Sequence, residues 1–439
     1  MKNSVVRMSV ILSVVLVAIL AIVSQQRLLA EATAVEGDGS VPCVNGMAGA
    51  IPCKNVDLLS YTPLIELGTQ TGSPGANLWG WTDSETGKEY VLFGMVDSLA
   101  ILDISDPVNP VQVGILPNHT ITNPQKYRDV KVYKDYAFVI ADELSFHGMQ
   151  VFDLTQVRGV TQSVTFSESA YFDGFGTAHN LFINEDTGYA YVVRTTEPGG
   201  NNPCGGAVYM VNIQDPLNPT PAGCFAEASG LASDSMCVLY HGPDEAFQGH
   251  ELCIVASDDD IIVGDVTDKI TPTVLADLTY PDIRRAHLAW LTEDHQFFVS
   301  ADMNDEMMLG LNTRIFIWDF RQVMTPTLMG YYEGASSASD HNVWVNGDYA
   351  YVGNFRAGMR ILDLHDIAST TMTNVTVFEA GYFDLYPDDD NAGHDAGAWA
   401  VYPFFESGVV AVSDKAEGLT LLRPDLIKEI YLPFVANMP

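Results

Sequence analysis

The chain repeats one pattern of apolar and polar positions, a short apolar strand that ends in an acidic or polar residue. Seven copies occur, at residues 99–103, 149–153, 208–212, 261–265, 315–319, 359–363 and, in degenerate form, 419–423. Successive copies begin roughly 44 to 60 residues apart, which is the span of one four-stranded propeller blade. The helical period of 3.6 residues is nearly absent between them, so the pattern predicts an all-β protein.

Each copy belongs to a larger unit of four predicted strands. Two β-rich segments precede each copy, as 130–133 and 136–140 precede the copy at 149–153. A fourth segment follows each copy, as 111–113 follows the copy at 99–103. Seven units of four antiparallel strands predict a seven-bladed β-propeller.

The last unit lacks an obvious fourth strand, whereas residues 58–67 resemble a fourth strand that has no blade of its own. We expect this early segment to complete the final blade, because the ring then closes without free strand edges. Residues 430–434 are the alternative donor, although Pro433 disfavours a strand there.

The N-terminus has the features of an export signal. Lys2 and Arg7 flank an apolar run at residues 8–23, and Ala30-Glu31-Ala32 offers a small-x-small cleavage pattern. An uncleaved anchor is the alternative. We therefore divide the chain into a signal peptide at 1–32, a cysteine-containing segment at 33–56, the propeller at 57–423 and a tail at 424–439. The protein is expected to be secreted, either free or associated with the cell surface.

Six cysteines follow the signal, an even number that indicates disulfides in an exported chain. They form sequence-local couples: Cys43 with Cys53, Cys204 with Cys224 and Cys237 with Cys253. Zinc binding is the competing hypothesis, but no Cys-x-x-Cys spacing is present. Six cysteines allow fifteen connectivities, so the local pairing is one of several.

The charge balance excludes some partners. The chain has 21 Lys and Arg against 56 Asp and Glu, a formal net charge of −35. Such a field repels nucleic acid and anionic lipid surfaces. It serves solubility in many secreted proteins, and cation binding is the alternative explanation.

The meander of a blade predicts which residues share a face, since innermost strands begin where the second-to-third loops lie. The candidate residues at the channel mouth are Asp129, His179, Asn180, Asp234, His287, Asp340, His341 and Asn342. An outer acidic ring is predicted from Asp142, Glu143, Asp258, Asp302, Asp305 and Glu306. Concave mouths of this kind commonly bind ligands.

Three functions fit this face. The first is a binding module for an extracellular protein or glycan, with aromatic residues such as Trp79 and Trp81 offering contact area. In the second, carboxylates and Asn carbonyls hold Ca²⁺ in the channel. The third is a metal-dependent hydrolase that uses His179, His287 and His341. Each histidine could instead bridge neighbouring blades, and no Gly-x-Ser-x-Gly, His-Glu-x-x-His or P-loop motif is present, which favours the binding module.

Several separated motifs resemble the choice-of-anchor B family, whose repeats are called LVIVD repeats. They are Trp79-Gly-Trp81, Gly148-Met-Gln-Val-Phe-Asp153, His179-Asn180, Tyr240-His-Gly-Pro-Asp244, Trp290-Leu-Thr-Glu-Asp294, Asp340-His-Asn342 and Arg356-Ala-Gly-Met-Arg360. The resemblance covers most of the mature chain and implies a bacterial or archaeal extracellular protein held by a C-terminal anchor, with no established activity.

The chain departs from the family in three places. Ser233-Asp234 stands where members show His-Asp, and His287-Leu-Ala-Trp290 stands where they show His-Gln-Gly-Trp. The tail lacks both a membrane span and a sortase-type motif, so the usual anchoring inference does not carry over.

Overall fold

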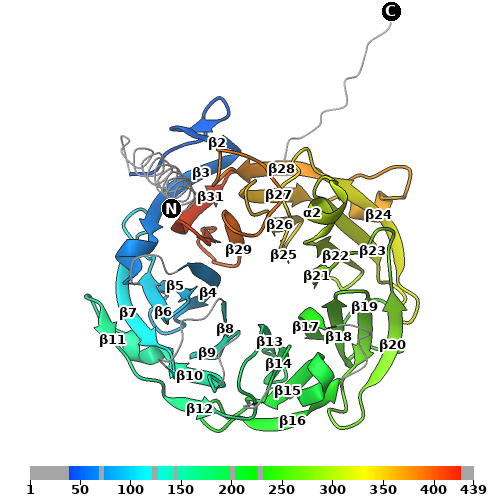
Figure 1. The fold of residues 1–439 in the computed structure, drawn as a ribbon, viewed down its shortest axis with the longest axis horizontal. Coiled ribbons are helices and arrows are strands. Elements are labelled where there is room, and N and C mark those ends of the chain that lie inside the picture. The colour runs from blue at the N-terminus through cyan, green and yellow to red at the C-terminus, as the bar shows by residue number, and fades with distance from the viewer. Residues whose placement is uncertain are drawn as a thin grey trace, which may run out of the picture.

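A computed structural model describes residues 39–68, 74–120, 127–142, 146–197, 203–225 and 231–426. Seven small antiparallel sheets stand in a ring around a common axis, each contributing one strand to the centre (Figure 1). The protein is therefore the seven-bladed β-propeller that the repeat predicted.

The blades follow one another along the chain, and their strands are given from the centre outward. Blade 1 has β4 (Gly75–Thr82), β5 (Glu89–Met95), β6 (Ser98–Asp103) and β7 (Val111–Pro117). Blade 2 has β8 (Arg128–Tyr133), β9 (Tyr136–Ala141), β10 (Met149–Asp153) and β12 (Ala170–Phe172). Blade 3 has β13 (Asn180–Asn184), β14 (Tyr189–Val193), β15 (Val208–Asn212) and β16 (Thr220–Phe225). Blade 4 has β17 (Ala232–Leu239), β18 (Glu251–Ser257), β19 (Ile261–Asp265) and β20 (Thr273–Leu278).

Blade 5 has β21 (Ala286–Leu291), β22 (Phe297–Asp302), β23 (Arg314–Asp319) and β24 (Thr327–Glu333). Blade 6 has β25 (Val343–Asn346), β26 (Tyr349–Gly353), β27 (Met359–Asp363) and β28 (Phe378–Phe383). Blade 7 has β29 (Ala398–Tyr402), β30 (Val410–Asp414), β31 (Gly418–Pro424) and β3 (Val56–Pro63). Further short elements are β1 (Met47–Ala48), β2 (Ile51–Lys54), β11 (Val164–Thr165), α2 (Asp305–Leu309) and the 3₁₀ turns Leu64–Leu67, Leu154–Val157, Pro203–Gly206 and Ile367–Ser369.

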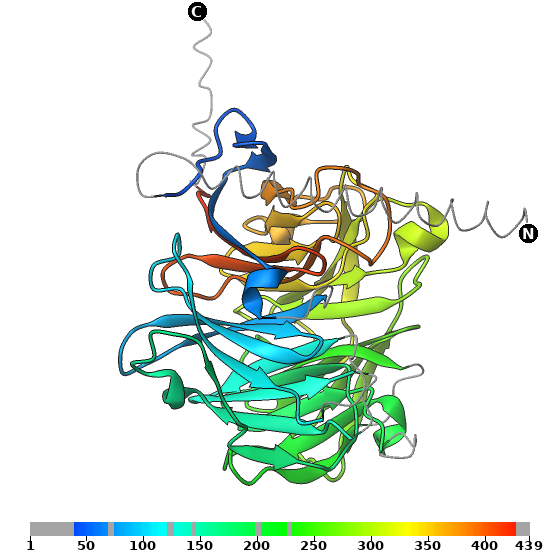
Figure 2. The same cartoon turned by 60° about the vertical axis from the view of Figure 1, so that its left-hand side comes forward.

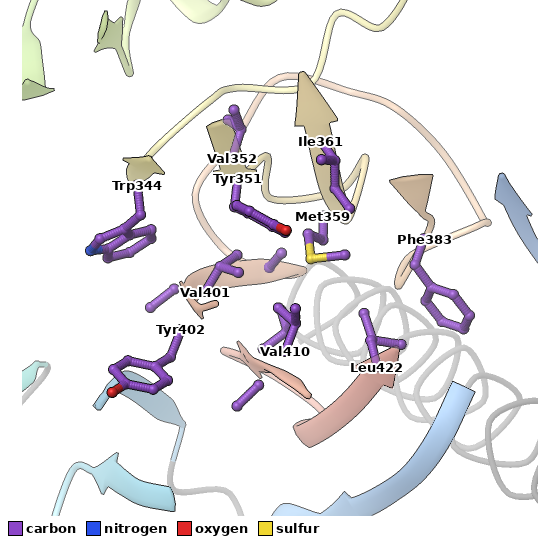
Figure 3. Close-up of a cluster of buried hydrophobic side chains, with 14 of the residues drawn as sticks. Trp344, Tyr351, Val352, Met359, Ile361, Phe383, Val401, Tyr402, Val410 and Leu422 are labelled. Carbon is purple, nitrogen blue, oxygen red and sulfur yellow. The ribbon is translucent and has the colours of Figure 1, made fainter. Parts of the chain in front are cut away.

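The middle strands of each blade are apolar because a neighbouring blade covers each of their faces. Every residue of β5 is buried, and Figure 3 shows Trp344, Tyr351 and Ile361 of blade 6 facing side chains of blade 7. Burial of this kind contributes roughly 25 cal/mol for each Å² of apolar surface removed from water. The core is thus a series of inter-blade layers.

Outer strands carry a recurrent bulge opposite the third strand. The register shifts at Ile101/Leu102, Met210/Val211, Val263/Gly264, Ile317/Trp318 and Ile361/Leu362. A bulge increases the local twist of a blade. Glycine follows it at several of these positions, and at Gly223 an added Cβ would lie 1.8 Å from the carbonyl oxygen of Lys269.

The N-terminal strand β3 closes the ring, as the sequence predicted. It pairs antiparallel with β31 from Val56↔Pro424 to Pro63↔Gly418. The Tyr61 hydroxyl also donates to the carbonyl oxygen of Glu417 at 2.9 Å. The alternative donor at 430–434, the signal peptide and most of the tail lie outside the described residues.

Three disulfides form with the expected local pairing: Cys43–Cys53, Cys204–Cys224 and Cys237–Cys253. No cysteine is free, so the zinc hypothesis is wrong for these residues. Cys43–Cys53 closes the β1–β2 hairpin, and β2 pairs with β28 and so extends blade 6 (Figure 2). Within the described ranges no helix is long and apolar enough to cross a membrane.

We predict that Leu58→Ala in β3 lowers the free energy of unfolding by about 2–5 kcal/mol, because Leu58 is fully buried where the ring closes. Val44→Ala, at an exposed position of the N-terminal hairpin region, should change it by less than about 0.5 kcal/mol. Urea unfolding of the two variants measures both. Equal effects would show that the closing strand does not carry this stability.

Candidate functional site

Asp129 joins three blades inside the channel. Its Oδ1 accepts hydrogen bonds from Asn77 Nδ2 of blade 1 at 3.0 Å and from Lys131 Nζ at 2.6 Å. Oδ1 also accepts from the amide of Val130, and Oδ2 accepts from the amide of Leu181 in blade 3 at 2.8 Å. Because β-strand residues two apart share a face, Lys131 lies in the channel beside Asp129. This ion pair is buried, with only 9% and 2% of the two side chains exposed.

A second carboxyl group stands in the same polar layer. Asn180 Nδ2 donates to Asp234 Oδ2 at 2.8 Å, and the amide of Ser235 donates to Oδ1. Burial and then the charge of Asp129 raise the pKa of Asp234 to about 8, so its proton is retained near neutral pH. Asn342 Nδ2 reaches Asn77 Oδ1 at 3.4 Å. The candidates Asp129, Asn180, Asp234 and Asn342 thus share one polar layer, in which Asn180 binds Asp234 while Asp129 and Asn342 both bind Asn77.

Above this layer, five aromatic rings form a closed circle. Successive centroids are 6.2 Å apart from Tyr127 to His179, 6.5 Å to His287, 4.2 Å to His341, 4.6 Å to Trp399 and 4.8 Å back to Tyr127. The rings come from blades 2, 3, 5, 6 and 7. The structure therefore brings the three candidate histidines to one place at the mouth.

The environments of these histidines differ. Burial and the neighbouring His341 lower the pKa of His287 well below its usual value, and burial does the same for His341, so both are neutral near pH 7. His341 Nδ1 donates to the carbonyl oxygen of Trp399 at 2.8 Å. His179 is the partly exposed member, and its Nδ1 lies 2.7 Å from Asp142 Oδ2. A carboxylate in this position fixes the orientation of the ring.

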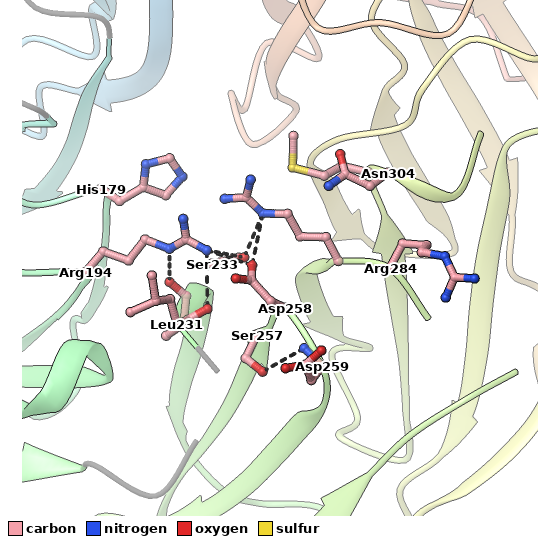
Figure 4. A network of polar contacts seen from close by, with 12 residues as sticks. His179, Arg194, Leu231, Ser233, Ser257, Asp258, Asp259, Arg284 and Asn304 are labelled. Atoms are coloured by element: carbon pink, nitrogen blue, oxygen red, sulfur yellow. Dashed lines mark hydrogen bonds and ion pairs between the residues drawn. The ribbon is translucent and has the colours of Figure 1, made fainter. Parts of the chain in front are cut away.

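Arg194 stands at the mouth beside His179 (Figure 4), and Arg285 shares its partner Asp258. Arg194 donates from Nε to the carbonyl oxygen of Ala232 at 2.8 Å and from Nη2 to Asp258 Oδ1 at 2.8 Å. Arg285 Nε donates to Ser233 Oγ at 3.2 Å and lies 3.4 Å from Asp258 Oδ1. Asp258 therefore bridges two guanidinium groups, and Ser233 binds both of them as well.

Not all carboxyl groups predicted for the outer acidic ring lie at the surface. Asp302, Asp305 and Glu306 are buried, because their side chains turn inward toward polar partners. Asp302 accepts from the amides of Arg284 and Arg285, and Asp305 pairs with the guanidinium of Arg314 at 2.5 Å. Of the rest, Asp142 and Asp258 contact His179 and the arginines, and Glu143 lies outside the described residues.

Asp340 belongs to this buried acidic group. Its amide donates to Glu306 Oε1 at 3.3 Å, and its Oδ2 accepts from the amide of Arg314. Among described residues, Asp340 Oδ1, Asp305 Oδ1 and Glu306 Oε2 are buried without a hydrogen-bond partner. Burial raises the pKa of Asp340 well above its usual value. Protonated carboxyl groups avoid the cost of several buried like charges.

The metal hypotheses gain no support from these donors. The described part of the chain contains no group of three or more His, Cys, Asp or Glu side chains that could hold a metal ion. In the channel, N–H donors occupy both oxygens of Asp129, and the Lys131 ammonium supplies the positive charge that Ca²⁺ was predicted to supply. The calcium site and the metal-dependent hydrolase remain predictions.

Sequence reasoning missed the basic character of the mouth. Arg285 directly precedes an innermost strand and Lys415 lies between a second and a third strand, so topology alone could have placed both. The Lys415 ammonium lies 4.9 Å from the Trp399 ring and 5.3 Å from the Tyr127 ring. These few cations were missed because the many carboxylates of the whole chain dominate its net charge.

Comparison with known proteins gives one family match, to the LVIVD repeat, at residues 90–116 and 338–375. These residues fall in blades 1 and 6, and the wider resemblance to the choice-of-anchor B family stays a prediction. No curated protein matches. Among solved structures, the chain is similar to the computationally designed Ika8 protein, with 10% identity, a TM-score of 0.47, and coverage of 79% of this chain and 82% of that one. A β-propeller with LVIVD repeats fits a binding or structural module.

Asp129→Asn should lower the free energy of unfolding by about 3–5 kcal/mol, because it leaves the buried Lys131 ammonium without its counter-ion. Asp319→Asn is the matched control, since Asp319 pairs with the exposed Arg321 and should contribute no more than about 1 kcal/mol. Denaturant midpoints compare the two variants. If Asp129→Asn lowered stability no more than Asp319→Asn does, the role of Asp129 in linking three blades would be contradicted.

Stability should fall as the pH rises above about 5, because burial and the adjacent Asp305 raise the pKa of Glu306 to about 9. The native state then holds a proton that the unfolded chain releases near pH 4.5, so each pH unit in this window costs up to about 1.4 kcal/mol per group. Melting temperatures between pH 5.5 and 8.5 should show a shallower decline in Glu306→Gln. Glu66→Gln, at an exposed position, should retain the wild-type slope, and identical slopes in all three proteins would refute this assignment.

Proposed function

We propose that this protein is an extracellular binding module that holds a protein or glycan ligand at the channel mouth. One observation carries the proposal. Both terminal nitrogens of Arg285 lack a hydrogen-bond partner among the described residues, although Ser233 and Asp258 hold the Nε of the same guanidinium. A guanidinium group that is held in position while its terminal N–H donors have no partner is suited to bind a ligand.

The surroundings support this location. The mouth combines the circle of five rings, which includes the partly exposed His179, with Arg194 and Arg285, and such mixed aromatic and polar groups are common in ligand sites. The rings pack against one another, so little side-chain freedom is lost when a ligand arrives.

The proposed extracellular location rests on two features. Three disulfides are typical of proteins that fold in an oxidising compartment, and the predicted signal at 1–32 provides the export route. Attachment to the cell surface would then present the mouth to ligands outside the cell.

Asp258→Trp should weaken binding at least tenfold by placing an indole against both arginines at the mouth, whatever the chemistry of the ligand. Glu245→Trp is the control, because it makes the same change in charge and a similar change in size at an exposed position on the opposite face. Arrays of neutral and acidic oligosaccharides and of immobilised secreted proteins serve as probes. We expect a probe that binds the wild type and Glu245→Trp, and binds Asp258→Trp at least tenfold more weakly.

Two results would overturn the proposal. Binding that Asp258→Trp leaves unchanged would place the ligand elsewhere on the propeller. A wild-type protein that binds nothing on either array would indicate a structural role.

A further inference from the structure

From this geometry we infer that the ligand is an acidic glycan whose sugar carboxylate binds the terminal nitrogens of Arg285, with Arg194 alongside. The inference rests on the proposed function and names the chemistry of the ligand. Arg–carboxylate pairs are frequently bidentate, because two parallel N–H donors match the two carboxylate oxygens.

The fold aims Arg285 at the mouth. Its backbone amide donates to Asp302 Oδ1 at 2.9 Å, and the amide of Arg284 donates to Oδ2 at 2.7 Å. The buried Asp302 carboxylate, also bonded by the Tyr280 hydroxyl, therefore fixes the loop before β21. With Nε held by Ser233 and Asp258, the two terminal nitrogens remain as a fork.

Arg194 adds a second positive charge close to this fork. Its φ of 52° and its bonds to the carbonyl oxygens of Ala232 and Leu231 hold the side chain against β17. Nη1 has no hydrogen-bond partner among the described residues. Burial, followed by the charge of Arg194, lowers the pKa of Arg285, which shows that the two cations repel each other. A bound anion would relieve this repulsion.

The neighbouring carboxylates favour a sugar acid over a polyanion. Asp258 is 40% exposed on its side chain, and Asp142 stands at His179 nearby. These acceptors suit hydroxyl groups but repel additional negative charge. A chain of net charge −35 likewise repels densely charged partners such as acidic peptides. One carboxylate among several hydroxyls is the arrangement that satisfies both kinds of group.

The test uses oligosaccharides that end in glucuronate, galacturonate or sialate, each with its carboxyl-reduced counterpart, and an Asp/Glu-rich peptide. Titration calorimetry compares the wild type with Arg285→Gln, Arg285→Lys and Arg321→Gln. Arg321 is the matched control, because it is an exposed arginine paired with Asp319 on the opposite face. Thermal melts establish that each variant is folded.

We expect at least one acidic oligosaccharide to bind, and Arg285→Gln to weaken it at least tenfold. Carboxyl reduction of the probe should weaken wild-type binding by a similar factor, with little further loss in Arg285→Gln, because the two changes remove the same contact. The affinity of Arg285→Lys should lie between those of the wild type and Arg285→Gln, since lysine keeps the charge but lacks the two parallel N–H donors. Arg321→Gln should bind as the wild type does.

The possible failures differ from one another. The protein could instead bind a neutral sugar, the acidic peptide or another protein, with an affinity that Asp258→Trp lowers and Arg285→Gln does not. That result would overturn the acidic-glycan inference and leave the proposed function standing. The absence of acidic-glycan binding would also overturn the inference. Absence of any Asp258→Trp-sensitive binding would overturn both.

Discussion

The antiparallel pairing of β3 with β31 is the constraint on which the other contacts of the ring depend. A propeller blade buries both faces of its middle strands against neighbours, so an open ring would expose two apolar faces and an unpaired strand edge. Here residues 56–63 supply the outer strand of a blade whose other strands come from residues 398–424. The two ends of the propeller thus share one sheet, and each blade keeps two neighbours.

Inside the channel, polar side chains also link neighbouring blades. Asp129 receives donors from blades 1, 2 and 3, and Lys131 neutralises it within hydrogen-bond distance. A buried charge of this kind is tolerable only when its partners are complete. The Asn and Asp side chains of this layer therefore cross-link neighbouring blades. The circle of five rings lies above them at the channel mouth.

Charge is distributed unevenly over this acidic protein. Several carboxyl groups are buried with a raised pKa, among them Asp234 at about 8 and Glu306 at about 9, so they hold protons. Cations gather at the mouth, where Arg194 and Arg285 share Asp258. The overall sign of the charge therefore does not describe the surface that we propose binds a ligand.

The amino-acid sequence by itself determined the blade count, the closing strand and the cysteine couples. All three follow from local rules: period-two apolar segments predict strands, repeat spacing predicts blades, and the cysteines were coupled by nearness in sequence. The pairing of Asp129 with Lys131 was also within reach, because strand residues two apart share a face. Only the tertiary structure decided the character of the mouth. Whether a loop side chain points outward depends on the donors that other blades place beside it. Asp302 thus turns inward to backbone amides, while the terminal nitrogens of Arg285 at the mouth have no hydrogen-bond partner among the described residues.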